Sequence, residues 1–182
     1  MTRGQFLKGC SSGVCSCAAA ALVPLEAAGA QSESTEVSAL KGKIDACQVR
    51  FAKLVGILNQ NLDPAARKKI FESLGRECAR QYREMTAKYT NDLKGYLAMA
   101  QTQWVEKAEF DEKAGTLRII DKGPGCSCPL VKTGMTPPEF CDCTLGWQKE
   151  AYSAMLGRPV EAELEESILR GGRRCIFRIR IA

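Results

Sequence analysis

The sequence predicts an α+β protein, with N-terminal helices packed on an antiparallel sheet, a closing helix and a C-terminal β-hairpin. Apolar residues recur at steps of three and four from Val37 to Leu58, which is the spacing of an amphipathic helix. After Trp104 the pattern changes to two apolar runs around a five-residue loop, Asp111 to Gly115, which indicates a hairpin. A second pair of alternating runs surrounds Gly171-Gly172 and indicates another hairpin.

Further helices are marked by their start signals. Asp63-Pro64 places an N-cap residue before a proline at the first helical position, so a helix is expected to begin there. A third helical stretch is expected over residues 84–100. Thr136 and Glu139 have capping-box spacing, with Pro137 between them, and predict a closing helix that runs to about Leu156.

The closing hairpin has a predicted register. If Gly171 and Gly172 are the two turn residues, the numbers of opposite residues sum to 343. Glu163 then faces Arg180 and Glu165 faces Arg178 on one charged face. Ile168 faces Cys175 on the apolar face, which this register also assigns to Glu166.

The N-terminal residues have the features of an export signal. Residues 1–30 combine a basic flank, an apolar middle and Ala28-Gly29-Ala30, which is the layout of a signal peptide. Residues 2–8 resemble a twin-arginine signal, although Gly4 stands at the second arginine position. We therefore expect an exported bacterial protein of the periplasm or cell envelope, without a stable membrane span after processing. Residues 31–36 are expected to form a flexible lead, and residues 37–182 a single domain.

The amino-acid composition excludes several kinds of catalytic site, metal site and partner. The 182 residues include ten cysteines and no histidine, and the formal net charge is +5. Without histidine, Ser-His and Cys-His catalytic arrangements and histidine-ligated zinc or haem are excluded. The charge excess is mild and no basic run is interleaved with aromatic residues, so no nucleic-acid partner is expected.

Cysteines carry the main functional signal. Cleavage after Ala30 leaves seven of the ten, an odd number that intramolecular disulfides alone cannot pair. Two C-x-C pairs, 126/128 and 141/143, are separated by twelve residues, a set that suits zinc or another soft metal. Structural disulfides and reduced thiols are the alternatives. The expected ligands are Cys126, Cys128, Cys141 and Cys143, with Cys175 and Glu166 as additional partners.

The position of each thiol suggests its state. A helix start at Pro137 places Cys141 and Cys143 in the first two turns, where the helix dipole is expected to lower their pKa values and favour thiolate. Cys47 and Cys78 lie on apolar faces of expected helices and are predicted to be small buried hydrophobes.

A family resemblance rests on the last forty residues. They are similar to the four-vinyl reductase small-molecule-binding domain at Cys141, Gly146, Gly157, Val160, Glu166, Gly171, Cys175 and Phe177. The run Gly75-Arg76-Glu77-Cys78 is similar to exported bacterial relatives of the L-2-amino-thiazoline-4-carboxylic acid hydrolase group. The resemblance implies an α+β domain that encloses a small, often apolar ligand, with a homodimer as one assembly.

The same resemblance implies a modified metal site. In the phenol-sensing branch, three cysteines and a glutamate of this segment hold a structural zinc. Cys141 and Cys175 match the first and last cysteine, whereas Ser167 and Leu164 occupy the other two positions. That site therefore does not carry over intact, and the remaining cysteines of the two pairs, with Glu166, are the expected substitutes.

The cysteine pattern and the family resemblance lead us to expect one of two functions. The favoured one is a non-catalytic binding protein, in which the cysteine-held metal lies next to an enclosed small-molecule pocket; no catalytic residue is assigned. The alternative is a thiol-dependent hydrolase of the amino-thiazoline type, with Cys141 or Cys143 as nucleophile and Glu166 as acid or base. Thiol–disulfide exchange is less favoured, because the sequence has no C-x-x-C motif.

Overall fold

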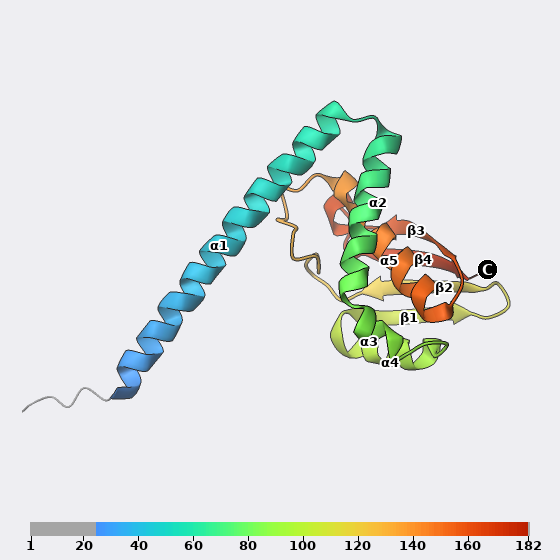
Figure 1. The fold of residues 1–182 in the computed structure, drawn as a ribbon, viewed down its shortest axis with the longest axis horizontal. Coiled ribbons are helices and arrows are strands. Elements are labelled where there is room, and N and C mark those ends of the chain that lie inside the picture. The colour runs from blue at the N-terminus through green and yellow to red at the C-terminus, as the bar shows by residue number, and fades with distance from the viewer. Residues whose placement is uncertain (1–24, 182) are drawn as a thin grey trace, which may run out of the picture. The chain divides into compact units, whose positions relative to one another are not determined.

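The computed structural model describes residues 25–181, with side chains described from residue 35 onward (Figure 1). Most of the predicted signal peptide, residues 1–30, therefore lies outside the described residues. The chain divides into one unit up to Leu40 and a second from Lys41 onward. Helix α1 extends from Leu25 to Asn61, so residues 31–36, expected as a flexible lead, are helical.

Helix α2, Pro64–Gln81, begins where its sequence signal predicted. The Asp63 carboxylate accepts hydrogen bonds from the backbone N–H groups of Ala65 (2.9 Å) and Ala66 (3.0 Å). It thereby satisfies two donors that the first turn of the helix leaves without a partner.

Replacement of that cap has a predictable cost. Asp63→Ala is expected to lower the free energy of unfolding by about 1 kcal/mol, because the two N–H groups lose their acceptor. Asp63→Asn keeps an acceptor oxygen and should stay close to the wild type. Urea denaturation of the two variants checks this, and equal losses in both would contradict a capping effect.

The predicted continuous helix over residues 84–100 is wrong. Helix α3 covers Arg83–Ala87 and helix α4 covers Leu93–Gln103. Between them Asn91 adopts a left-handed conformation (φ 59°). The Asp92 carboxylate accepts from the Gly95 N–H (2.8 Å), so a new N-cap restarts the helix.

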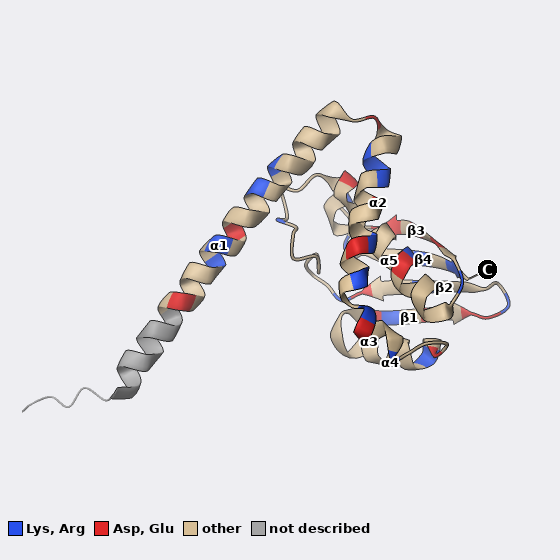
Figure 2. Cartoon of the chain, in the orientation of Figure 1, with Lys and Arg blue, Asp and Glu red and all other residues tan. Residues whose placement is uncertain are grey.

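Four antiparallel strands form one sheet in the order β1-β2-β4-β3. They are β1 Val105–Asp111, β2 Thr116–Asp121, β3 Val160–Glu166 and β4 Ile176–Ile181. The predicted first hairpin, β1–β2, and the predicted α+β class are confirmed. Residues of both charges are present along α2 and on the sheet (Figure 2).

The closing hairpin is offset by two residues from the predicted register. Glu163 lies opposite Arg178, so opposite numbers sum to 341. A 3₁₀ helix, η2 (Ile168–Arg170), and the following loop replace the tight turn, and the expected pairing of Ile168 with Cys175 does not form. A shift of two preserves the faces of both strands. The expected charge pairs Glu163–Arg180 and Glu165–Arg178 consequently form as diagonal ion pairs.

The closing helix α5, Cys141–Leu156, follows a short 3₁₀ helix, η1 (Pro138–Phe140). Its predicted end at Leu156 is confirmed, but the predicted capping box is wrong. Thr136 Oγ1 accepts from the Lys132 N–H (3.0 Å), and the Glu139 carboxylate accepts from Asn59 (2.7 Å). Both side chains are thus engaged by neighbouring segments rather than by the first turn of the helix.

Two apolar clusters make up the interior. The larger lies between the sheet and helices α4 and α5, and includes Tyr96, Tyr152, Leu117, Phe177 and Ile179. The smaller joins α1, α2, α5 and the loop after β2, through Val55, Phe71, Val131, Phe140 and Cys143. Cys175 packs against the first cluster, and Cys126 and Cys128 pack against the second.

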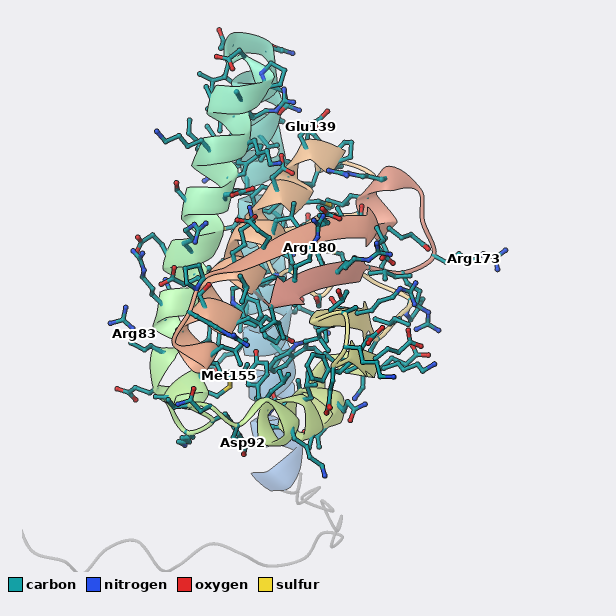
Figure 3. All side chains as sticks on the ribbon, turned by 90° about the vertical axis from the view of Figure 1, so that its right-hand side faces the viewer. Arg83, Asp92, Glu139, Met155, Arg173 and Arg180 are labelled. Atoms are coloured by element: carbon teal, nitrogen blue, oxygen red, sulfur yellow. The ribbon has the colours of Figure 1, made fainter. Side chains whose placement is uncertain are left out.

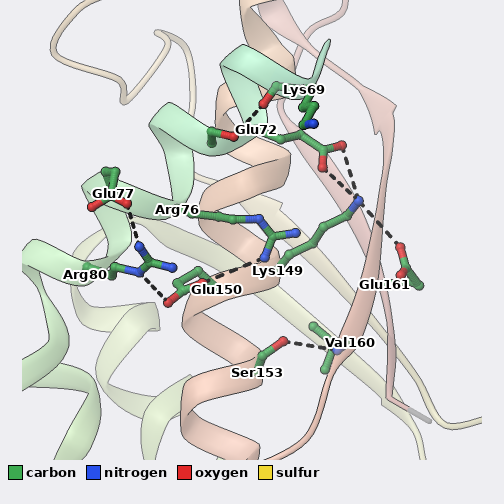
Figure 4. A network of polar contacts seen from close by, with 11 residues as sticks. Lys69, Glu72, Arg76, Glu77, Arg80, Lys149, Glu150, Ser153, Val160 and Glu161 are labelled. Carbon is green, nitrogen blue, oxygen red and sulfur yellow. Dashed lines mark hydrogen bonds and ion pairs between the residues drawn. The ribbon is translucent and has the colours of Figure 1, made fainter. Parts of the chain in front are cut away.

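Helices α2 and α5 approach each other more closely than ordinary side chains permit. A Cβ atom on Gly75 would lie 1.7 Å from the Cys143 carbonyl oxygen, and one on Gly146 would lie 2.0 Å from the Glu72 carbonyl oxygen. Beside this crossing, Lys149 contacts Glu72 (3.2 Å) and Arg80 contacts Glu150 (2.9 Å) (Figure 4). The two glycines set the distance between α2 and α5, and the ion pairs lie beside the crossing.

Candidate functional site

Four thiols line one small, partly enclosed cavity. Cys126 and Cys128 come from the loop after β2, Cys141 from the start of α5, and Cys175 from the residue before β4. The space that a water-sized sphere can reach is about 10 Å³, which is room for one water molecule. The remaining wall is mostly apolar, with Val131, Phe140, Leu164, Leu169 and Phe177, and includes the hydroxyl residues Thr144 and Ser167.

The structure thus brings together three of the four cysteines in the two predicted pairs, and adds Cys175. Cys143 is not among the residues that line the cavity. It is 8% exposed and packs in the smaller apolar cluster beside Phe71 and Phe140. Because α5 turns by about 100° per residue, Cys141 and Cys143 lie on different faces of the helix.

The predicted thiolate character of Cys141 and Cys143 is wrong. Burial raises the pKa of Cys141, and it raises the pKa of Cys143 to about 12. Burial likewise raises the pKa of Cys128. Removal of a thiolate from water outweighs the modest attraction of a helix N-terminus. These thiols therefore carry their protons at neutral pH.

Cys126 is the exception. A hydrogen bond from the Cys175 thiol lowers the pKa of Cys126, and the same bond raises the pKa of Cys175. The two residues titrate as a coupled pair, and Cys126 is the thiol that ionises first.

Ser167 occupies a central position at the cavity. It is 1% exposed, and its Oγ accepts from the Cys141 thiol (3.4 Å) and from the Arg170 N–H (3.2 Å). Ser167 therefore links the start of α5 to the backbone of η2 at the cavity wall.

Glu166 lies outside the cavity wall. Its carboxylate accepts from the N–H groups of Arg173 (2.6 Å) and Arg174 (3.1 Å), which holds the chain between η2 and β4. Figure 3 shows Arg173 projecting outward from this loop. Glu166 also borders an open, mostly polar hollow of about 290 Å³, which shares Leu164 and Ser167 with the thiol cavity.

Asp121 is a buried acid that sequence reasoning missed. It is 7% exposed, and its Oδ1 has no hydrogen-bond partner among the described residues. Burial raises the pKa of this carboxyl to about 7. Its N–H donates to the Cys175 carbonyl (3.0 Å), beside the site. The alternation of Leu117 and Ile119 on the inner face of β2 extends to position 121 and could have identified it.

The thiols do not already converge on one point. In residues 35–181, as their side chains are placed, no group of three or more acidic or cysteine side chains could hold an ion together. All seven cysteines from Cys47 onward are free thiols. Cys47 is exposed and Cys78 is half-buried, so the prediction that both are buried is wrong for Cys47.

Within the described part of the chain, no helix has the length and apolar character that a membrane crossing requires.

Comparisons with known proteins show the fold. No protein-family model and no curated protein matches the sequence. A solved structure of a trafficking protein particle complex subunit 3 from Naegleria fowleri, covalently bound to palmitic acid, is 16% identical with a TM-score of 0.55, over 78% of this chain and 96% of that chain. The phenol-responsive sensory domain of the transcription activator PoxR, solved with phenol, is 11% identical with a TM-score of 0.49, over 72% and 73%. The chain thus shares the α+β fold of the trafficking-complex subunit.

Proposed function

We propose that this chain is an exported, four-vinyl-reductase-like binding protein that holds one soft metal ion through Cys126, Cys128, Cys141 and Cys175. The observation that carries the proposal is that these four thiols line one small, partly enclosed cavity. A four-sulfur donor set suits zinc and other thiophilic ions. Cys143, which lies outside the cavity wall, is left out of the ligand set.

Two properties of the cavity support an ion rather than an organic ligand inside it. Its volume of about 10 Å³ is too small for an organic molecule. Its four thiols are soft donors, and they would have to turn toward one centre, since as placed no three of them could hold an ion together. Because burial raises the pKa values of Cys128 and Cys141, an ion would have to displace their protons, and affinity should fall as the pH falls.

A small polar ligand would occupy the neighbouring hollow. That hollow is close to the usual lower limit of ligand pockets, and Glu165, Glu166 and Arg170 give it charge of both signs. It shares two wall residues with the thiol cavity, so an ion there would order one side of the ligand site. The covalently bound palmitic acid of the trafficking-complex subunit supports small-molecule binding as one use of this fold.

Elemental analysis and free-thiol counting on the full chain, purified without added metal, test the proposal. We expect about one ion per chain, with the cavity thiols protected from alkylation until a chelator is added. Cys128→Ser and Cys141→Ser should lose both the ion and thermal stability. Cys47→Ser, an exposed cysteine on α1, is the matched control and should retain both. A metal-free chain with four alkylatable cavity thiols would overturn the proposal.

The alternative is the thiol-dependent hydrolase. The raised pKa values of Cys141 and Cys143 disfavour it, because a nucleophilic cysteine needs its thiolate. In a hydrolase Cys141→Ser would abolish turnover while the fold survived. In the metal-binding protein the same substitution would remove the metal and lower the melting temperature.

A further inference from the structure

We propose that Cys126 and Cys175 form a reversible disulfide by exchange with small disulfides, and that this oxidation releases the metal. Release of the metal rests on the proposed function, whereas formation of the disulfide does not. The proposal makes the cavity a site with two exclusive states, a reduced one that holds an ion and an oxidised one that cannot.

The sheet places the segments that carry the two cysteines next to each other. Cys126 follows β2 and Cys175 precedes β4, and these strands are neighbours with Ile120 opposite Ile176. The ladder is continued by the hydrogen bond from the Asp121 N–H to the Cys175 carbonyl (3.0 Å). Both thiols line the same cavity, whose volume is only about 10 Å³. Rotation of the two side chains within so small a space would bring the sulfurs to bonding distance.

The other thiols are less suited to pair with Cys126. Cys128 is only two residues away, and a disulfide between them would close a short, strained ring. Cys141 is engaged with Ser167 (3.4 Å). Cys143 is not in the cavity wall.

Access to Cys126, Cys128 and Cys175 differs from access to Cys141 and Cys143. Cys126 and Cys175 are half-buried, whereas Cys141 and Cys143 are each only 8% exposed. A small disulfide can therefore approach Cys126 or Cys175 while the deeper thiols stay shielded. Oxidation at the cavity should consequently spare Cys141 and Cys143.

The exchange proceeds in two balanced steps. The Cys126 thiolate attacks one sulfur of the small disulfide, so a mixed disulfide forms and one small thiolate leaves. Cys175, as its thiolate, attacks the Cys126 sulfur, so the protein disulfide forms and the second small thiolate leaves. Two protein thiols lose two electrons to the small disulfide, and their two protons pass through solvent to the departing thiolates. A small dithiol reverses both steps.

The test uses the full chain, reduced, stripped of metal by a chelator, and exposed to oxidised glutathione. After blocking of free thiols and tryptic digestion, we expect peptide Gly123–Lys132 linked to peptide Cys175–Arg178, with the link reversed by dithiothreitol. Because Cys128 lies in the first peptide, Cys128→Ser should keep the link, while Cys126→Ser and Cys175→Ser should lose it. Cys47→Ser is the control and should behave as the wild type.

A stable glutathione adduct on Cys126, or a link from Cys126 to any other cysteine, would overturn the proposal. A second arm begins with chain preloaded with zinc, and we expect one zinc released for each disulfide formed. If the chain forms the disulfide but never binds zinc, the proposed function fails and the disulfide stands. If it binds zinc but oxidised glutathione gives neither link nor release, the inference fails and the proposed function stands.

Discussion

Gly75→Ala is expected to lower the free energy of unfolding by about 3 kcal/mol or more, the range of severe overpacking. The added Cβ would lie 1.7 Å from the Cys143 carbonyl oxygen and 2.8 Å from its carbon. Both atoms belong to the backbone of α5, so no side-chain rotation can relieve the clash. The two helices would have to separate, with loss of contacts around Phe71 and Cys143.

Gly146→Ala should act in the same way from the opposite helix. Its Cβ would lie 2.0 Å from the Glu72 carbonyl oxygen, so both glycines serve one crossing. Once the helices have separated, the second substitution meets less resistance. The double variant should therefore cost less than the sum of the two single variants.

Helix α1 offers the control. Nothing lies within 4 Å of a Cβ built on Gly56 or Gly42, and both are helical. Gly56→Ala is expected to raise the free energy of unfolding by up to about 1 kcal/mol, because alanine is the better helix former. Urea denaturation of the full chain measures all four variants. A loss below about 1 kcal/mol in Gly75→Ala would show that the helices accommodate a methyl group and contradict the close crossing.

Asp121→Asn is expected to make the metal-free protein more stable at pH 8, where the wild type must bury a charged carboxylate. The folded-state pKa is about 7, above the ordinary value of 3.8. A raised carboxyl pKa means that the stabilising effect of the protonated form is complete below about pH 4 and is lost as the pH rises to about 7. The difference amounts to roughly 4 kcal/mol by linkage, as an order of magnitude.

Unfolding free energies of wild type and Asp121→Asn, measured between pH 4 and pH 8, check this. The gain from the substitution should grow with pH over that window and level off above it. Glu112→Gln, at an exposed carboxyl in the β1–β2 loop, controls for the loss of one negative charge. A gain that is constant across the window would show that Asp121 is not the titrating group.

Local signals predicted much of this fold. The Asp63-Pro64 start of α2, the first hairpin and the end of α5 depend on neighbours within a few residues, so the sequence shows them directly. The interruption between α3 and α4 at Asn91 also has a local cause. The amphipathic spacing on both sides of it suggested one continuous helix, so the N-cap at Asp92 was not recognised. The hairpin register failed because η2 depends on contacts made by Ser167 and Glu166 across the loop.

The sequence predicted which cysteines form the candidate site better than it predicted whether their thiols are protonated. The spacing of the two C-x-C pairs indicated a cluster, and three of its four members share the cavity with Cys175. The protonation of Cys141 and Cys143 depends on how much water remains around each sulfur, and this is set by segments distant in the sequence. The same holds for Asp121, whose burial requires the helices that cover the sheet.

The edges of the sheet have a consequence for behaviour at high concentration. Among residues 25–181, β1 and β3 are the outer strands of the sheet, and each leaves one row of backbone N–H and C=O groups without a neighbouring strand. On β3, Glu161, Glu163 and Glu165 project from one face; on β1, Lys107 and Glu109 do so next to an irregularity after Val105. Strand addition by another chain would bring like charges together on β3 and meet a distorted ladder on β1. The sheet is thereby protected at both ends against edge-to-edge aggregation.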